Sequence, residues 1–184
     1  IPNTFRRIFG EGSFNAAFVP SYVKELTKSK KNSENFANKV FSLLTFSLFG
    51  LVILVELFMP LFVSLIAPGF KSDPEKFILA TDLTRITFPF ILFISLASFF
   101  SAILNSHNKF AAASAAPIIL NIVLIITLLC AKYLDDHLVI YMSYGVSIAG
   151  FIQMIFLIFT LKKIYKPQFR AKLNIDNKTK SFFK

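Results

Sequence analysis

Residues 110–131 read FAAASAAPIILNIVLIITLLCA, and residues 138–161 read LVIYMSYGVSIAGFIQMIFLIFTL; neither run contains a charged side chain. Each run reaches the roughly 20 apolar residues that a helix needs to span a bilayer. Two further runs precede them, Ile86–Leu104 and Val40–Ala67. The alternative, helices buried in a soluble core, is disfavoured because such helices rarely continue this long without a polar stripe. The sequence therefore predicts an all-α, polytopic transmembrane helix bundle.

The composition agrees with this fold class. Hydrophobic residues make up 55% of the 184 residues, above the roughly 45–50% that is usual for soluble domains. The first segment, Ile1–Leu26, is less clear because Gly10, Gly12 and Pro20 weaken a straight helix. It is either the second part of a spanning helix or a helix lying in the interface. The chain opens at Ile1, inside a motif, so we expect a fragment that lacks an N-terminal part.

Basic residues concentrate in three of the five connections, namely Ser21–Lys39, Asn105–Lys109 and the tail from Lys162. Pro68–Arg85 and Lys132–His137 carry more balanced charge. With four spans, the three basic connections fall on one side, which the positive-inside rule assigns to the cytoplasm. The net charge of +10 thus indicates membrane topology, and we expect no nucleic-acid partner.

The tail forms a second unit. We expect residues 1–161 to make the bundle and residues 162–184 to be a basic cytoplasmic linker. Apolar contacts come from Ile164, Tyr165, Phe169 and Leu173, so the tail is expected to lie on the membrane surface and to be attracted to anionic membrane lipids. The alternative is a disordered, solvated tail.

Residues suited to catalysis are scarce. His107 and His137 fall in loops on opposite faces, so they cannot share a metal, and each is expected to be solvated. Asp135-Asp136 lacks the second acidic cluster of a two-metal site, and the single cysteine, Cys130, cannot form an internal disulfide. We therefore expect no enzyme activity, no metal and no cofactor.

Polar groups inside the apolar runs are the remaining candidates for function, because a charge at mid-membrane costs roughly 2.5–3.5 kcal/mol on insertion scales. Glu56 is either an interface anchor or a cavity residue, since Pro60 follows it closely. Asn121 lies four residues after Pro117, where a proline kink would aim it at a cavity or at a neighbouring helix. Gln153 is expected to be a packing or interface group.

The cluster that most suggests a binding site consists of Arg6, Arg7 and Glu11. On a helix, Arg7 and Glu11 are four residues apart and share a face, so the carboxylate could hold Arg7 and leave Arg6 for a ligand. The planar guanidinium of arginine matches phosphate oxygens. The alternative is a basic pair at the membrane edge whose side chains extend to the lipid headgroups.

Three blocks in order carry a family resemblance. Residues 1–20, IPNTFRRIFGEGSFNAAFVP, resemble the signature PN–RR–F–EG–F–AFVP of the MurJ/MviN lipid II flippases. Residues 83–90, LTRITFPF, followed by SLA at 95–97 and AILN at 102–105, make a second block, and residues 116–122, APIILNI, make a third. The resemblance covers Ile1 to about Phe169.

The resemblance implies part of the N-terminal lobe of an alternating-access flippase. Members of this family have two lobes around a central cavity and move the undecaprenyl-pyrophosphate-linked peptidoglycan precursor, lipid II, across the bacterial cytoplasmic membrane. Arg6 falls on the family's cavity arginine, Glu11 on its motif acid and Asn121 on a cavity-facing asparagine. Arg6 and Asn121 are thus implied to bind substrate, with Arg7, Glu11 and Pro117 in support. The remaining helices of the full-length protein are implied partners.

Three alternatives stay open. Another exporter of the same superfamily, carrying a lipid-linked oligosaccharide or a drug, would lack the Arg6, Arg7 and Glu11 cluster. An intramembrane enzyme acting on a prenyl phosphate would need acidic ligands, for which Asp135-Asp136 is the sole candidate. A membrane scaffold without transport activity is the third.

Overall fold

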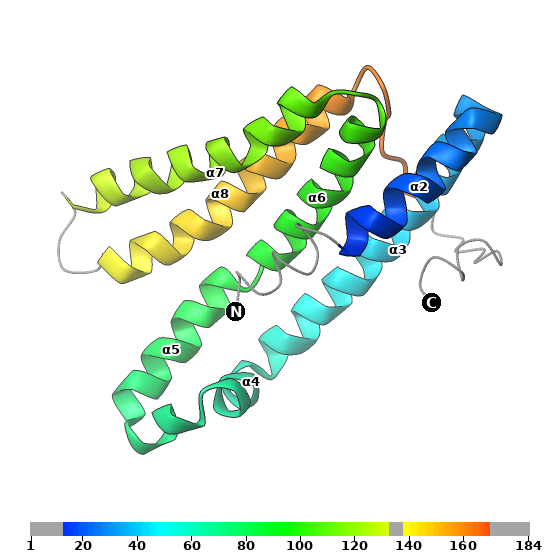
Figure 1. Cartoon of the computed structure of the whole chain (residues 1–184). Coiled ribbons are helices and arrows are strands. Elements are labelled where there is room, and N and C mark those ends of the chain that lie inside the picture. Colours follow the sequence, from blue (N-terminus) through cyan, green and yellow to red (C-terminus); the bar gives the residue numbers. More distant parts are fainter. Residues whose placement is uncertain (1–12, 133–137, 170–184) are drawn as a thin grey trace.

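The computed structural model describes residues 13–132 and 138–169, and within them every regular element is a helix (Figure 1). This confirms the expected all-α class. The helices run in the order α2 (Ser13–Lys28), α3 (Lys30–Leu57), α4 (Met59–Ile66), the 3-10 helix η1 (Pro68–Ser72), α5 (Pro74–Thr87), α6 (Phe90–Ser106), α7 (Phe110–Ala131) and α8 (Leu138–Leu161).

The Lys-rich stretch Ser21–Lys39 is helical, so the expectation of a connecting loop there is wrong. Only Ser29 leaves the helical conformation, with φ −169° and ψ 152°. Its hydroxyl accepts a hydrogen bond from the backbone N–H of Asn32 at 3.1 Å and so caps α3. Helices continue past the apolar run because a capped, Lys-rich turn outside the membrane costs little in helix propensity.

The long apolar run Val40–Ala67 is divided into two helices. α3 ends at Leu57, Phe58 adopts φ −110° and ψ 27°, and α4 begins at Met59. Pro60 explains the break, because a proline has no N–H to donate to the carbonyl of Glu56 and its ring crowds the preceding turn. The first span therefore changes direction near Glu56.

The stretch Pro68–Arg85, also expected to be a loop, forms η1 and most of α5. Asp73 caps α5 by accepting from the backbone N–H of Lys76 at 3.2 Å, and Pro74 occupies the first turn, where its missing N–H is not needed. α5 ends at Thr87, and α6 starts at Phe90 in roughly the same direction after a break at Phe88 and Pro89 (Figure 1).

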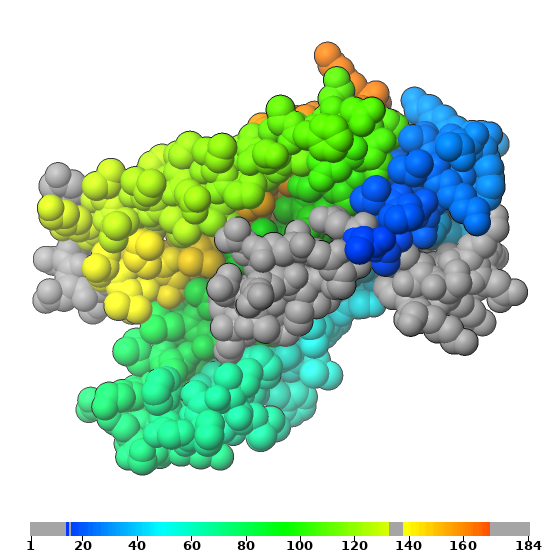
Figure 2. Space-filling view, in the orientation of Figure 1, coloured from blue at the N-terminus to red at the C-terminus, as the bar shows by residue number. Residues whose placement is uncertain are grey.

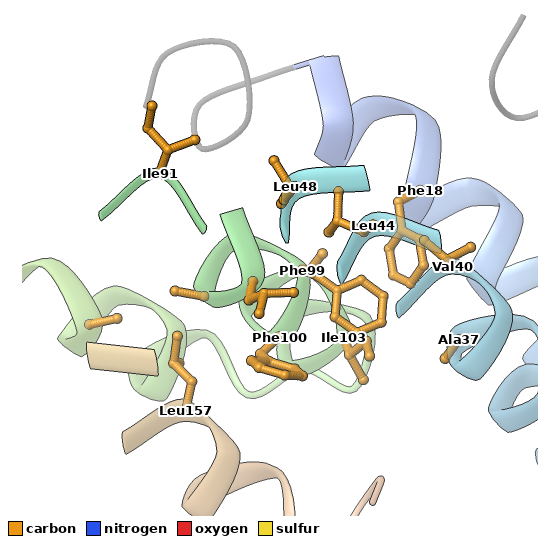
Figure 3. Packing of buried hydrophobic residues seen from close by; sticks show 14 of the residues in the cluster. Phe18, Ala37, Val40, Leu44, Leu48, Ile91, Phe99, Phe100, Ile103 and Leu157 are labelled. Carbon is orange, nitrogen blue, oxygen red and sulfur yellow. The ribbon is translucent and has the colours of Figure 1, made fainter. Parts of the chain in front are cut away.

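α6 is the central helix. α2 and α3 pack on one side of it and α8 on the other, while α7 packs mainly on α8 (Figure 1). Phe99, Phe100 and Ile103 of α6 lie between Val40 of α3 and Leu157 of α8 (Figure 3). The core is therefore built around the α6 side chains.

α7 lies at the edge of the bundle. Of its residues, Ala116 and Ala131 alone are buried, and its side chains lie along the upper edge of the molecule in the space-filling view (Figure 2). Within the described residues, four helical stretches are long and apolar enough to cross a membrane: Lys30–Leu57, Pro74–Ser106, Phe110–Ala131 and Leu138–Leu161.

Candidate functional site

The signature at the start of the chain leads into α2, which is fixed by aromatic packing. The ring of Phe18 is fully buried and lies 5.1 Å from Phe99 of α6 and 5.8 Å from Phe36 of α3, measured between ring centroids. Phe14 lies 6.4 Å from Phe99. Arg6, Arg7 and Glu11 lie outside the described residues. The helix that follows them therefore starts from a rigid position beside α6.

Asn121 and Pro117 share the exposed face of α7 with Ile118, Ile122 and Ile125. Pro117 lies inside a helix that continues without a break from Phe110 to Ala131. No other described residue forms a hydrogen bond with the Asn121 side chain. The interhelical hydrogen bond considered for Asn121 is therefore absent from the described part of the chain, and its amide is open to whatever covers this face.

Glu56 pairs with Arg85, a contact that the sequence did not indicate. The Arg85 Nε lies 3.5 Å from the Glu56 Oε2, which joins the end of α3 to the end of α5. The second carboxylate oxygen, Oε1, is buried without a hydrogen-bond partner among the described residues. The distance and the half-exposed Arg85 side chain indicate a weak ion pair. Both interpretations of Glu56, interface anchor and cavity residue, stay predictions.

Asn38 of α3 is a second polar group that sequence reasoning missed. It is buried, and its Oδ1 accepts hydrogen bonds from the Tyr165 hydroxyl at 2.6 Å and from the backbone N–H of Gln168 at 2.9 Å. Tyr165 is itself buried. The expectation that Tyr165 lies on the membrane surface is therefore wrong, because its ring packs inside the bundle.

His107 is partly buried, which corrects the expectation of a solvated loop histidine. Its Nε2 lies 3.0 Å from the Tyr22 hydroxyl of α2. Burial lowers the pKa of His107 below its usual 6.5, and the nearby positive charge of Lys30 lowers it further. The neutral imidazole is therefore favoured, and Nε2 accepts a hydrogen bond from the Tyr22 hydroxyl when the ring carries its own proton on Nδ1.

The break between α5 and α6 is held by α8. The Ser147 hydroxyl donates to the backbone carbonyl of Ile86 at 2.6 Å. A Cβ at Gly150 would lie 2.5 Å from Cδ2 of Phe90, so only glycine permits this close approach of α8 to the start of α6. Gln153, expected to be a packing group, is buried on the same helix.

Charge separates the two ends of the bundle. The α2–α3 junction, the α6–α7 junction and the end of α8 lie at one end (Figure 1). The described cations there are Lys24, Lys28, Lys30, Lys31, Lys39, Lys109, Lys162, Lys163 and Lys166. Two carboxylates in the described part of the chain oppose them, and both form ion pairs: Glu25 with Lys28 at 2.7 Å and Glu34 with Lys30 at 3.9 Å.

The opposite end is balanced. Its described cations are Lys71, Lys76, Arg85 and Lys132, and its described carboxylates are Glu56, Asp73, Glu75 and Asp82. His137 and the Asp135-Asp136 pair lie outside the described residues. Among residues 13–132 and 138–169, no three His, Cys, Asp or Glu side chains are grouped as a metal site would require.

Long apolar helices, polar contacts between them and this charge difference define the class: the chain is part of a multi-pass α-helical membrane protein. The family model described as "Lipid II flippase MurJ" matches residues 1–184. The chain belongs to this family.

Curated relatives support the assignment. A probable lipid II flippase MurJ of Rickettsia prowazekii (strain Madrid E) is 43% identical over 164 residues, which cover 89% of this chain and 32% of the relative. That of Rhizobium tropici is 44% identical over 158 residues, 83% of this chain and 30% of the relative. The chain thus spans about a third of the length of these relatives.

A solved structure shares the fold. The structure described as "Lipid II flippase MurJ, inward closed conformation" aligns with a TM-score of 0.80 at 31% identity, and covers 99% of this chain and 37% of that one. The described helices therefore match about a third of the fold of that longer protein.

Proposed function

We propose that the protein containing this chain is a lipid II flippase, which moves the undecaprenyl-pyrophosphate-linked peptidoglycan precursor across the bacterial cytoplasmic membrane. The observation that carries the proposal is the family match along all 184 residues. The family is one of flippases, so the activity is transport and not the making or breaking of covalent bonds. Alternating access, in which two halves rock around a central site, is the mechanism.

The substrate site in this proposal has two parts. Arg6 binds the pyrophosphate, because a guanidinium offers two parallel donors to phosphate oxygens. Arg7 and Glu11, four residues apart, pair with each other and keep the motif in shape. The packing of Phe14 and Phe18 against Phe99 supports this role, since it gives the motif a rigid helix to lead into.

Asn121 is proposed to reach the substrate cavity from α7, with Pro117 setting the local backbone. Two observations support this role: Asn121 lies on an exposed apolar face, and its side chain has no hydrogen-bond partner among the described residues. The relatives are about three times longer than this chain. We propose that their remaining helices enclose the cavity on this side.

Complementation tests the proposal. The full-length gene is expressed in a bacterial strain whose own lipid II flippase can be depleted, and growth and membrane levels are measured together. We expect the wild-type gene to restore growth. If the protein reaches normal levels in the membrane and the cells still lyse, the result would contradict the proposal. It would favour an exporter of another lipid-linked oligosaccharide.

A further inference from the structure

The chain that follows α8 does not leave the bundle at the end of that helix. Residues 162–169, which we name the strap, pass over the end of α6 and reach α3 (Figure 1). Tyr165, halfway along the strap, is 2% exposed, and its ring lies 6.5 Å from that of Phe99. At the far end, the ring of Phe169 lies 4.7 Å from Phe46 and 6.4 Å from Phe41, both on α3.

A buried polar contact fixes the strap. One oxygen, Oδ1 of Asn38, accepts from the Tyr165 hydroxyl at 2.6 Å and from the Gln168 backbone N–H at 2.9 Å. Asn38 is 3% exposed, so water cannot replace either donor without opening the contact. Removing the acceptor would take a hydrogen bond from both the Tyr165 hydroxyl and the Gln168 backbone N–H. The contact therefore selects one position for the strap on α3.

We propose that the strap anchors the end of α8 to α3, and that α3 and the strap move as one body during transport. Asn38 and Tyr165 are the positioning residues. The joint motion of α3 and the strap during transport rests on the proposed function, whereas the docking of the strap on α3 does not.

Hydrogen exchange of the full-length protein tests the docking. In the Asn38→Leu variant, which keeps a side chain of similar size, we expect the Gln168 amide to exchange about tenfold faster than in the wild type. Tyr165→Phe keeps the ring and the Gln168 contact, so it should accelerate exchange less. Tyr144→Phe is the matched control, because Tyr144 is an exposed tyrosine on α8, and it should leave the exchange unchanged. Equal exchange in wild type and Asn38→Leu would overturn the docking.

A cross-link tests the motion. Phe46→Cys and Phe169→Cys are combined in a protein that lacks other cysteines, with Cys130→Ser among the replacements, and joined by a short bismaleimide in membranes. We expect the two cysteines to be cross-linked efficiently and the cross-linked protein to support growth as the wild type does. In the Asn38→Leu variant, we expect the cross-link to restore the activity that the substitution reduces. Loss of activity on joining would show that the strap must release and would overturn the single-body proposal. Normal activity of unbridged Asn38→Leu with lost protection would overturn the positioning role. If the wild-type protein does not flip lipid II, the proposed function is wrong, but hydrogen exchange and cross-linking yield still test the docking of the strap.

Discussion

His107 connects the end of α6 to α2 through the Tyr22 hydroxyl, and burial favours its neutral form. Its pKa in the folded state lies below the usual value of 6.5, because of burial first and the positive charge of Lys30 second. At a pH between the folded and unfolded pKa values, the unfolded chain therefore binds more protons. Stability is then lost as the pH falls below about 6.5 toward the folded value.

We therefore expect the melting temperature of the detergent-solubilised full-length protein to fall as the pH is lowered from about 7.5 to about 5. His107→Gln should reduce this dependence, because glutamine keeps a hydrogen-bond partner for Tyr22 and cannot titrate in this range. Thermal unfolding of both proteins at each pH measures the difference. The same pH dependence in the two proteins would remove His107 as its source.

Individual polar contacts were the least predictable feature. Tyr22 and His107 are 85 residues apart in sequence, and Asn38 and Tyr165 are 127 apart. Hydropathy and charge spacing report on neighbours along the chain, so these pairs give no local signal. Glu56 stands out in the sequence as a charge inside an apolar run. Its partner Arg85 falls in a predicted loop, because α5, the helix that contains Arg85, is too polar to resemble a span.

At the level of elements, α8 owes its position to glycines that admit neighbouring side chains. A Cβ at Gly150 would meet Cδ2 of Phe90 at 2.5 Å, whereas a Cβ at Gly50 of α3 would meet nothing within 4 Å. We expect Gly150→Ala to destabilise the bundle by about 1–3 kcal/mol through overpacking. Gly50→Ala should be neutral or stabilise by up to about 1 kcal/mol, because alanine favours helix.

Unfolding of the full-length protein in mixed micelles, with each variant compared with the wild type, measures both effects. Adding Phe90→Leu to Gly150→Ala should restore part of the loss, since the smaller side chain makes room. If Gly150→Ala is as stable as Gly50→Ala, the close packing of α8 on Phe90 is not what holds these helices.

Hydropathy located α7 and α8 with the same bounds as the structure, because both are apolar from end to end. It misplaced the ends of α3 and α5, because a membrane-spanning helix continues into polar sequence that hydropathy does not detect. Capping residues mark these ends instead: Ser29 precedes α3 and Asp73 precedes α5.

For the whole molecule, the uneven charge predicts the orientation in the membrane. The end that carries Lys30 and Lys109 is expected in the cytoplasm, and the end that carries η1 outside. Asn32 and Ser72 are exposed, so each can be replaced by cysteine in a background without other cysteines. An impermeant thiol reagent added to intact spheroplasts should label Ser72→Cys and leave Asn32→Cys unlabelled. The reverse pattern would invert the orientation.

The proposed function requires that the full-length protein moves lipid II and that Arg6 binds its pyrophosphate. Wild type, Arg6→Ala, Arg6→Lys and the control Lys109→Ala are reconstituted into vesicles with labelled lipid II, and its transfer between leaflets is measured with matched protein amounts. We expect transfer by the wild type and the control, a large loss for Arg6→Ala, and a smaller loss for Arg6→Lys, which keeps the charge without the paired donors. Wild-type transfer no faster than in protein-free vesicles would contradict the function, and full transfer by Arg6→Ala would contradict the site.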